Sequence, residues 1–309
     1  MNAEDAALLE LGRHLRRADY FFVTITPESH GRVNARVGAA EARTLRDVFG
    51  WNRPFRPETV GERIWSLLDQ ADAVAACAGL YISKIRFSTY DALIFLHSAY
   101  PTLAANSVFF GPDTYRFLAA IEHCLGERSR AARRVVDIGT GSGAGGILLA
   151  RHLPGAEIVL ADISDDALRY AGINAALNEA QQVVLAHSDV LGSLDGQFDL
   201  VVANPPYLVD PKARLYRDGG GKLGHDLALR ILRESLDRLA PGGVLLLYTG
   251  SAIVDGEDVF RARAQQMLHQ GGFAHSYVEI DPDVFGEELA GGAYGQADRI
   301  AAVTLTVAA

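Results

Sequence analysis

From residue 134 to the end of the chain, short apolar runs alternate with amphipathic segments. The runs are as long as buried strands, and the segments between them repeat apolar residues at helical spacing. Strands that alternate with helices in this way predict a parallel, doubly wound α/β sheet of Rossmann-like type. The seven predicted strands are residues 135–138, 157–161, 183–186, 198–203, 244–248, 276–280 and 299–307.

The first hundred residues lack this regularity. Apolar residues recur at helical spacing in two stretches, 3–18 and 62–78, whereas residues 80–96 are richer in strand formers. We therefore expect an N-terminal domain, α+β or mostly helical, over residues 1–106. A second domain, which contains the sheet, is expected over residues 107–309.

Bulk composition is that of an ordinary globular protein, and it limits which cellular compartment and which partners we expect. No apolar run is long enough to span a bilayer, and the first ten residues carry acids instead of a signal-peptide core. Cys77 and Cys124 are too few and too isolated for a disulfide framework. These features predict a cytoplasmic protein without a membrane partner. The nine histidines show no zinc-like spacing, so we also expect no metal.

The acidic excess lies in the second half of the chain. The formal net charge is −9, and residues 131–309, with 14 basic and 23 acidic residues, account for all of it. A non-specific grip on nucleic-acid phosphates needs clustered lysine and arginine. The charge therefore favours a protein or small-molecule substrate, although local basic patches still permit RNA.

Arginines are concentrated in two stretches. Residues 31–56 interleave them with Trp51 and Phe55, which suits stacking and charge contacts with single-stranded nucleic acid. Acidic residues are mixed in, so an ordinary solvated surface is the favoured interpretation. The other stretch, residues 127–134, is the candidate joint between the two halves.

A glycine-rich turn follows the first predicted strand of the sheet. Gly139, Thr140, Gly141 and Gly143 lie between that strand and a helix, where backbone approaches a ligand closely and helix-start N–H groups face negative charge. Asp162 ends the next strand, the position from which a carboxylate accepts hydrogen bonds from ribose hydroxyls. A lone glycine-rich turn is weak evidence, but the two features together predict a nucleotide-like ligand.

Two features decide between two such ligands: Asp137, two residues before Gly139, and the segment Asn204-Pro205-Pro206-Tyr207, which has no evident role in hydride transfer. Asp137 stands where a carboxylate would meet the ammonium in the methionine part of S-adenosylmethionine (SAM), whereas it would repel the pyrophosphate of a nicotinamide dinucleotide. SAM is therefore the expected cofactor.

The fourth predicted strand runs into Asn204-Pro205-Pro206-Tyr207, which is called here the Asn204 turn. A proline pair cannot continue a strand ladder, so the chain must turn, and carbonyls just past the strand end lack ladder partners. The Asn204 side chain, the Pro205 carbonyl and the Tyr207 ring would then gather at one sheet edge. That set suits a planar group carrying an N–H₂, and a rigid turn without a catalytic role is the alternative.

In the order of these motifs, residues 134–250 resemble the class I SAM-dependent methyltransferases. The resemblance implies a seven-stranded methyltransferase sheet preceded by a substrate-recognition domain. It also implies that Asp137 and the glycines hold the methionine part of SAM, Asp162 the ribose, and Asp189 with Val190 the adenine. Ile163 and Asn204 are further expected cofactor-binding residues.

The Asn-Pro-Pro-Tyr form of the motif belongs to enzymes that methylate planar nitrogen, which implies catalytic roles for Asn204, Pro205 and Tyr207. Residues 108–114 add a resemblance to the release-factor glutamine methyltransferases, whose Pro-Asp-Thr is normally followed by Glu, where this chain has Tyr115. The resemblance covers about the last two-thirds of the chain.

Three functions follow from these expectations. The first is methylation of a protein glutamine amide, with a translation factor as the partner. The second is methylation of an exocyclic amine in RNA or DNA, and the third is methylation of a small molecule. Residues 208–224 have the composition of a lid over the Asn204 turn or of a plain surface loop, and the acidic loop 281–289 is expected to be structural.

Overall fold

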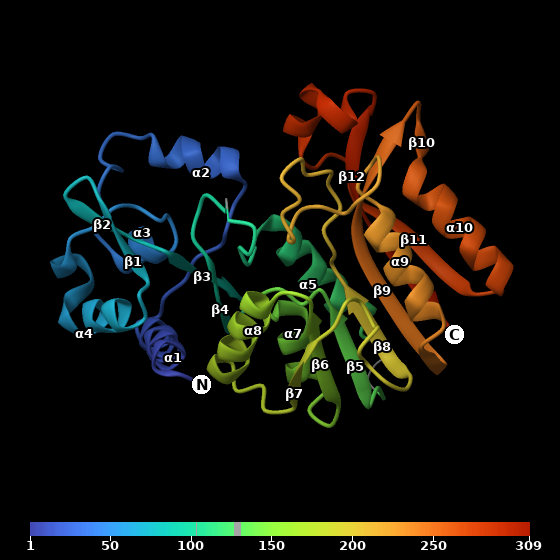
Figure 1. Ribbon diagram of the computed structural model, residues 1–309, viewed down its shortest axis with the longest axis horizontal. Helices are drawn as coiled ribbons and strands as arrows, with labels where there is room; N and C mark the ends of the chain where they lie inside the picture. Colours follow the sequence, from blue (N-terminus) through green and yellow to red (C-terminus); the bar gives the residue numbers. More distant parts are fainter. Residues whose placement is uncertain (103, 127–130) are drawn as a thin grey trace.

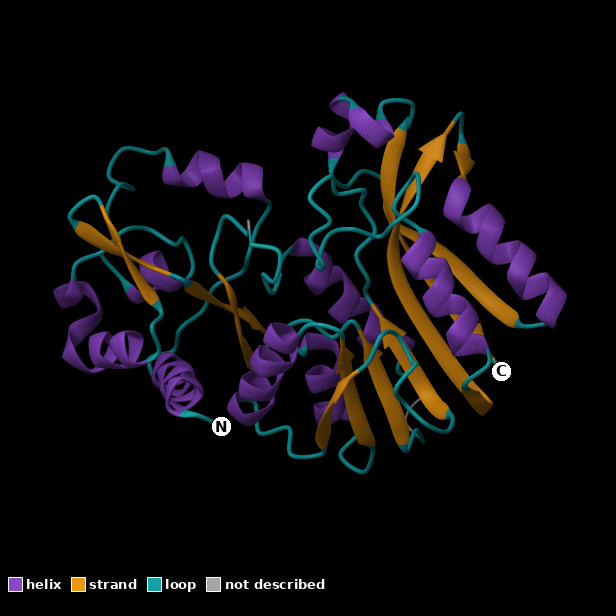
Figure 2. Ribbon diagram, in the orientation of Figure 1, coloured by secondary structure: helices purple, strands orange, loops and turns teal. Residues whose placement is uncertain are grey.

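The computed structural model describes residues 1–102, 104–126 and 131–309. Four residues of the expected joint, 127–130, thus lie outside the described part of the chain. The arrangement of the elements is shown in Figures 1 and 2, with the N-terminal part on the left and the large sheet on the right.

The large sheet has the seven predicted strands in the order β11-β12-β9-β8-β5-β6-β7, with the two-residue β10 beside β9. The five strands from β9 to the edge strand β7 are parallel, and β12 runs antiparallel between β9 and β11. The strand bounds are β5 (Arg134–Ile138), β6 (Glu157–Asp162), β7 (Val183–His187), β8 (Phe198–Ala203), β9 (Leu239–Val254), β10 (Glu257–Asp258), β11 (Ala274–Asp281) and β12 (Arg299–Ala308). The predicted Rossmann-like, doubly wound sheet is confirmed.

Helices cover both faces of this sheet because its strands alternate their side chains between two cores. Val135 of β5 points into the core under α5, α7 and α8, whereas Val136 points into the core under α9 and α10. The helices are α5 (Pro112–Cys124), α7 (Ala144–His152), α8 (Asp165–Leu177), α9 (Asp226–Leu236) and α10 (Val259–Gly271). Two short 3₁₀ helices, η1 (Gly286–Ala290) and η2 (Gly292–Tyr294), precede β12.

The N-terminal part is of the α+β kind. It combines helices with two antiparallel hairpins, β1–β2 and β3–β4. Its elements are α1 (Ala3–Arg17), α2 (Pro27–Asn34), α3 (Leu45–Phe49), α4 (Pro57–Gln70), β1 (Val74–Cys77), β2 (Leu80–Ser83), β3 (Ile85–Tyr90) and β4 (Leu93–Ser98). The division between residues 106 and 107 stays a prediction.

The helix expected over residues 62–78 ends too late. α4 spans Pro57–Gln70 but is broken at Gly61 (φ +77°), so its longer part begins at Glu62 as expected, and β1 pairs with β2 after Gln70. Alanines at 73, 75 and 76 favour a helix locally, but pairing across the hairpin overrides that weak preference.

Asn174 of α8 and Asn178, which caps the C-terminal end of that helix, join the N-terminal part to the sheet domain. The side chain of Asn174 accepts from the Leu96 N–H at 2.7 Å and donates to the Leu96 carbonyl at 2.9 Å, so it pairs with β4 as a neighbouring strand would. Asn178 pairs with Ile94 in the same way. Asn174 also donates to the Ser142 carbonyl in the glycine-rich turn, at 2.8 Å. One buried amide therefore ties the β3–β4 hairpin to the turn after β5.

No described helix is long and apolar enough to cross a membrane.

Candidate active site

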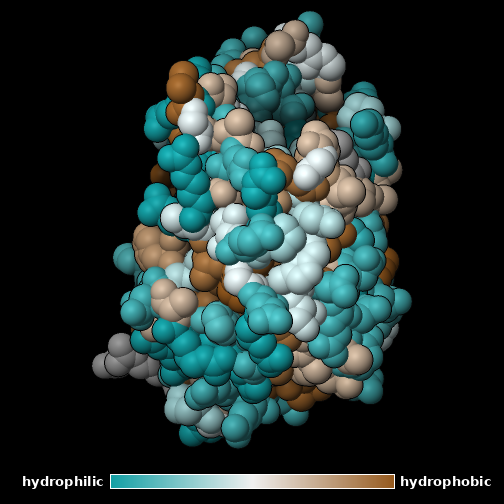
Figure 3. Space-filling view, turned by 90° about the vertical axis from the view of Figure 1, so that its left-hand side faces the viewer, coloured by the Kyte–Doolittle hydropathy of each residue, from teal (hydrophilic) through white to brown (hydrophobic). Residues whose placement is uncertain are grey.

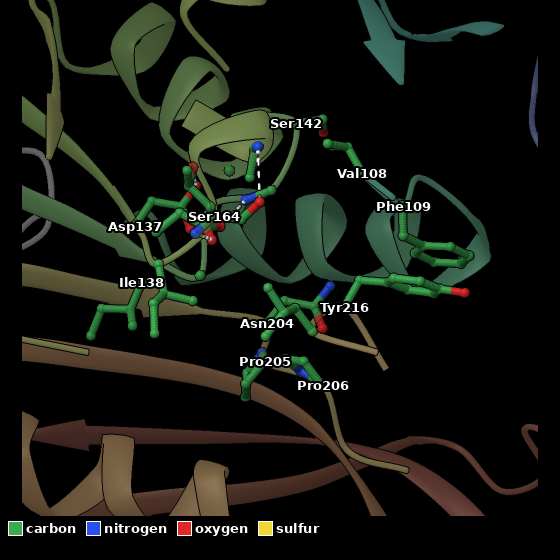
Figure 4. Close-up of a pocket in the computed structure, with 18 of the residues that line it drawn as sticks. Val108, Phe109, Asp137, Ile138, Ser142, Ser164, Asn204, Pro205, Pro206 and Tyr216 are labelled. Carbon is green, nitrogen blue, oxygen red and sulfur yellow. Dashed lines mark hydrogen bonds between the residues drawn. The ribbon is translucent and has the colours of Figure 1, made fainter. Parts of the chain in front are cut away.

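The candidate site lies where the strand order reverses. β5 has β6 on one side and β8 on the other, so the loops after β5 and β8 leave the sheet in opposite directions and open a crevice at its carboxyl edge. Two adjoining pockets occupy this edge. Both are lined by Phe109, Asn204, Pro205, Pro206 and Tyr216. The Asn204 turn is thus part of the boundary between them, as Figure 4 illustrates for the larger pocket.

The larger pocket, called here the cofactor pocket, is built on the glycine-rich turn. Gly139 and Gly141 have φ angles of +65° and +54°, which residues with a Cβ rarely adopt. The turn can therefore fold back over the end of β5 and present its backbone to the cavity. Asp137, Gly139, Thr140 and Gly141, four of the predicted cofactor-binding residues, line this pocket. Gly143 caps the start of α7 instead, with a φ of +81°.

Asp137 is a buried carboxylate with one oxygen committed to the protein. Its Oδ2 accepts hydrogen bonds from the Thr140 hydroxyl at 2.7 Å and the Gly146 N–H at 2.9 Å. No donor in the described ranges reaches Oδ1. Burial raises the pKa of Asp137 to about 6, against the lowering effect of those two hydrogen bonds. A cation that enters the pocket could pair with Oδ1 and restore the charged form.

Asp162 bridges the turn after β5 and the loop after β6. One oxygen accepts from the Gly141 N–H and the other from the Ser164 N–H, each at 2.9 Å. Burial raises the pKa of this carboxyl, and the backbone hydrogen bonds act in the opposite direction. Ile163 follows with 49% of its surface exposed, and it also lines the cofactor pocket.

Asp189 and Val190 line the same pocket from the loop after β7, but Asp189 is less enclosed than Asp137 and Asp162. Its side chain is 57% exposed, and both of its oxygens accept from Arg230, at 2.9 and 3.0 Å. Val190 is buried with a φ of +53°, a strained conformation for a β-branched residue. Its role and that of Asp189 in holding adenine stay predictions.

The Asn204 turn carries two polar groups that no other group in the described structure engages. Neither the Asn204 side-chain amide nor the Pro205 carbonyl takes part in a hydrogen bond within residues 1–102, 104–126 and 131–309. A strand ladder would have used the carbonyl, and the proline pair prevents that ladder from continuing. Two acceptor oxygens therefore face the boundary of the two pockets and are available to a ligand.

Tyr207, the last residue of this turn, is buried, with 7% of its surface exposed. Its ring packs against Tyr248 and Phe285, with centroids 6.4 and 5.8 Å apart. A Cβ at position 250 would lie 2.2 Å from the Tyr207 ring, so only glycine fits there. The ring is one wall of the smaller pocket, which is called here the acceptor pocket.

The acceptor pocket draws its other walls from distant segments. Asp113 of α5 lies there, almost fully buried, and accepts from the Tyr248 hydroxyl at 2.6 Å and from Arg116 at 3.2 Å. Burial raises the pKa of Asp113, although Tyr248 and Arg116 favour its charged form. Phe285 is a wall residue that sequence reasoning missed, because it stands in the loop expected to be structural. No local motif marks it.

Tyr115, the residue that replaces the expected Glu, lines neither pocket. Its hydroxyl accepts from the Thr24 N–H at 3.0 Å, and its ring packs against Tyr90 and Phe110. The replacement of the expected Glu by Tyr115 therefore affects the contact between α5 and the N-terminal part.

Residues 208–224 form an ordered loop over the pockets, called here the lid loop. Arg214 binds both oxygens of Asp210, at 2.7 and 2.8 Å, and the Tyr216 hydroxyl donates to the Thr102 carbonyl. Tyr216 also lies nearly parallel to Phe109, with ring centroids 6.0 Å apart, as Figure 4 shows. The lid loop is thereby attached to the segment that leads into α5.

Among the described residues, no group of three or more His, Cys, Asp or Glu could hold a metal ion.

Comparison with known families gives one match. Residues 119–254 match the family model described as "Methyltransferase small domain". The matched segment includes the glycine-rich turn, Asp162, Asp189 and the Asn204 turn.

Curated relatives match parts of the chain. A release factor glutamine methyltransferase of Lactococcus lactis subsp. lactis is 30% identical over 54% of this chain and 63% of its own length. One from Deinococcus radiodurans is 40% identical over 37% of this chain and 44% of its own. A ribosomal protein uL3 glutamine methyltransferase of Neisseria meningitidis is 35% identical over 40% of this chain and 45% of its own. The chain thus spans less than two-thirds of each of these relatives.

Solved structures support the fold. TYW2 of M. jannaschii, solved in complex with AdoMet, has a TM-score of 0.51 at 14% identity and covers 76% of this chain and 92% of its own. Trm5b of Pyrococcus abyssi has a TM-score of 0.51 at 15% identity, over 81% and 68% respectively. At these identities the likeness establishes the architecture alone.

Proposed function

The chain carries a methyltransferase small domain over residues 119–254, and from that premise we propose that it is a SAM-dependent N-methyltransferase acting on a planar nitrogen. The observation that carries the proposal is the pair of unengaged acceptors, the Asn204 amide oxygen and the Pro205 carbonyl, where two pockets meet. One pocket would hold the methyl donor and the other the acceptor group.

The donor set of the cofactor pocket fits SAM. Asp137 offers Oδ1 to an ammonium, and Asp162 stands at the end of β6, where it can accept from ribose hydroxyls while it also holds Gly141 and Ser164. Ile163, Val190, Leu227 and Ile231 supply apolar wall for a base. SAM brings a methyl group on a sulfonium, which is already a strong methyl donor, so the protein's task is to position and stabilise.

The Asn204 turn would raise the reactivity of the acceptor nitrogen. An amide or exocyclic amine is a poor nucleophile because its lone pair is delocalised into the neighbouring π system. Two N–H groups that donate to Asn204 and Pro205 become more acidic as positive charge develops on the nitrogen, so these hydrogen bonds strengthen in the transition state. Tyr207 supports the turn from behind, and alignment of the reacting atoms supplies a further share of the rate.

We propose the side-chain amide of a protein glutamine, on a translation factor, as the acceptor. The curated relatives named above are glutamine methyltransferases of release factors and of ribosomal protein uL3. Pro112-Asp113-Thr114 opens α5 at the edge of the pockets, which agrees with that group. The acidic balance of residues 131–309 also favours a protein over a nucleic acid.

An RNA or DNA exocyclic amine is the second candidate. Residues 31–56 would have to supply the grip, yet Arg32, Arg53 and Arg56 already pair with acidic neighbours. Figure 3 shows the face of the molecule at the N-terminal side, where hydrophilic and apolar residues are mixed. A base in a duplex would also have to be flipped out to reach the acceptor pocket. These points rank the candidate below a protein amide, and a small-molecule acceptor stays third.

Methyl transfer from labelled SAM separates these candidates. A lysate incubated with the protein and methyl-labelled SAM should yield labelled protein, and enzymatic hydrolysis of that protein to amino acids should release N-methylglutamine. The matched control is Asn204→Ala, which should reduce the rate of labelling about 10²- to 10³-fold. Label confined to RNA or DNA would contradict the protein acceptor, and label confined to compounds of low mass would support the third candidate.

A further inference from the structure

Three consecutive residues of the lid loop divide between the two pockets. Leu215 lines the cofactor pocket alone, Tyr216 lines both pockets, and Arg217 lines the acceptor pocket alone. A single short segment is therefore a shared wall. Any movement that places Leu215 against the contents of one pocket also repositions Arg217 in the other.

The exposure of the Leu215 side chain is not explained by its contacts within the protein. It is a large apolar side chain, 52% exposed, on a loop that is otherwise anchored by polar contacts. It faces the cofactor pocket together with Ile163, which is 49% exposed. When a ligand covers exposed apolar side chains that converge on one cavity, the burial of their surface lowers the free energy of the complex.

Polar contacts hold the segment on both sides of Leu215. Before it, Arg214 binds Asp210 through two hydrogen bonds. After it, Arg217 pairs with Glu288 and lies over the Phe285 ring, 5.8 Å from its centroid. Tyr216, in the middle, is fixed to Thr102 and to the Phe109 ring. The segment is therefore held as a unit, with Tyr216 against Phe109 and Arg217 against Phe285.

We propose that Leu215 is a cofactor-binding residue contributed by the lid loop, and that cofactor binding further orders the lid, which its polar contacts already anchor, and so stabilises the shared wall of the acceptor pocket. The inference rests on the proposed use of SAM. Apolar contact between Leu215 and the bound cofactor holds the shared wall in place. The cofactor accordingly binds first, and the acceptor enters a pocket whose Tyr216 and Arg217 are already fixed.

Binding of S-adenosylhomocysteine, the product form of the cofactor, tests the contact without any acceptor. Leu215→Ala should weaken the Kd measured by calorimetry roughly tenfold, because three carbon atoms of a partly covered side chain are lost. Leu215→Met keeps the volume and should restore affinity to within about threefold. Lys212→Ala, an exposed lid residue that lines neither pocket, should bind as the wild type does. A Kd for Leu215→Ala within twofold of the wild type would overturn the contact.

Amide hydrogen exchange tests the ordering of the lid. In the wild type, saturating S-adenosylhomocysteine should slow exchange in a peptide that covers residues 208–224 by about tenfold or more. In Leu215→Ala, held at a ligand concentration that saturates it, the slowing should be largely lost. Equal protection in both proteins would show that the lid is ordered by something other than Leu215.

The two proposals can fail separately. If the wild type binds neither SAM nor S-adenosylhomocysteine, the proposed function is wrong. If the wild type binds and Asp162→Ala weakens binding while Leu215→Ala does not, the function stands and the role of the lid is wrong. Leu215 is exposed, so its substitution should leave the melting temperature unchanged, and that measurement excludes a folding defect as the cause.

Discussion

The cofactor pocket and the acceptor pocket share an edge of one sheet but are built in different ways. Most of the predicted cofactor-binding residues of the first come from the carboxyl ends of β5 and β6 and from the loops after β5, β6 and β7, three strands that follow one another in the chain. The second is assembled from α5, the Asn204 turn, the lid loop and Phe285 near η1, which are far apart in sequence. A pocket made of loops that follow adjacent strands leaves local signals, whereas one made by packing of distant segments does not.

A second difference lies in how the polar groups are satisfied. In the cofactor pocket, Asp137 and Asp162 hold the backbone that surrounds them, so these carboxylates shape the pocket as well as line it. In the acceptor pocket, the Asn204 amide and the Pro205 carbonyl hold nothing within the described part of the chain. Substitutions should accordingly change binding in the first pocket and turnover in the second.

The largest effect is expected at Asn204. Asn204→Ala removes one of the two acceptors that strengthen in the transition state, so kcat should fall about 10²- to 10³-fold. The Kd for S-adenosylhomocysteine should change by less than about threefold, because the carboxylates that hold the cofactor are untouched. Single-turnover kinetics and calorimetry measure the two quantities. A loss of cofactor affinity equal to the loss of rate would erase the distinction between the pockets.

The next effect compares two acidic residues of the cofactor pocket. Asp162→Ala should weaken S-adenosylhomocysteine binding about 30-fold or more, because charge-assisted hydrogen bonds to the ribose and the anchors of Gly141 and Ser164 are lost together. Asp189→Ala should weaken it only about threefold, since the Asp189 side chain is exposed and already paired with Arg230. Titration calorimetry of both variants decides the point. Equal losses of affinity in the two variants would mean that the Asp189 carboxylate breaks its ion pair with Arg230 and binds the ligand itself.

The smallest effect is a pH dependence of cofactor binding. The pKa of Asp137 is raised to about 6, and an ammonium pairs with the ionised carboxylate, so the affinity for S-adenosylhomocysteine should rise about tenfold between pH 5 and pH 7. The stability of the ligand-free protein should change with pH in the opposite direction. Because the pKa is higher in the folded than in the unfolded chain, stability falls as the pH rises from about 4 to about 6. In Asp137→Asn both trends should be absent, and affinities that still rose with pH would point to another group.

The success of sequence reasoning followed the same division. The seven strands and the glycine-rich turn were predicted, because each depends on residues within a few positions of one another. The order of the strands places Asp137, Asp162 and Asn204 at one edge, so these residues could be grouped before their contacts were known. The helix expected through residue 78 was wrong because pairing of β1 with β2 outweighs the helical preference of alanine.

The sequence by itself determined the fold class and the groups that follow each strand, since strand length, proline pairs and glycine turns act locally. Only the tertiary structure decided what surrounds them. It brought Phe285 against Tyr207, tied Asn174 to both β4 and the glycine-rich turn, and set Leu215, Tyr216 and Arg217 along two pockets. The contacts of Phe285 with Tyr207 and of Asn174 with Leu96 each join residues 78 positions apart. Each side chain alone is compatible with many partners, so packing of the whole chain selects the one that forms.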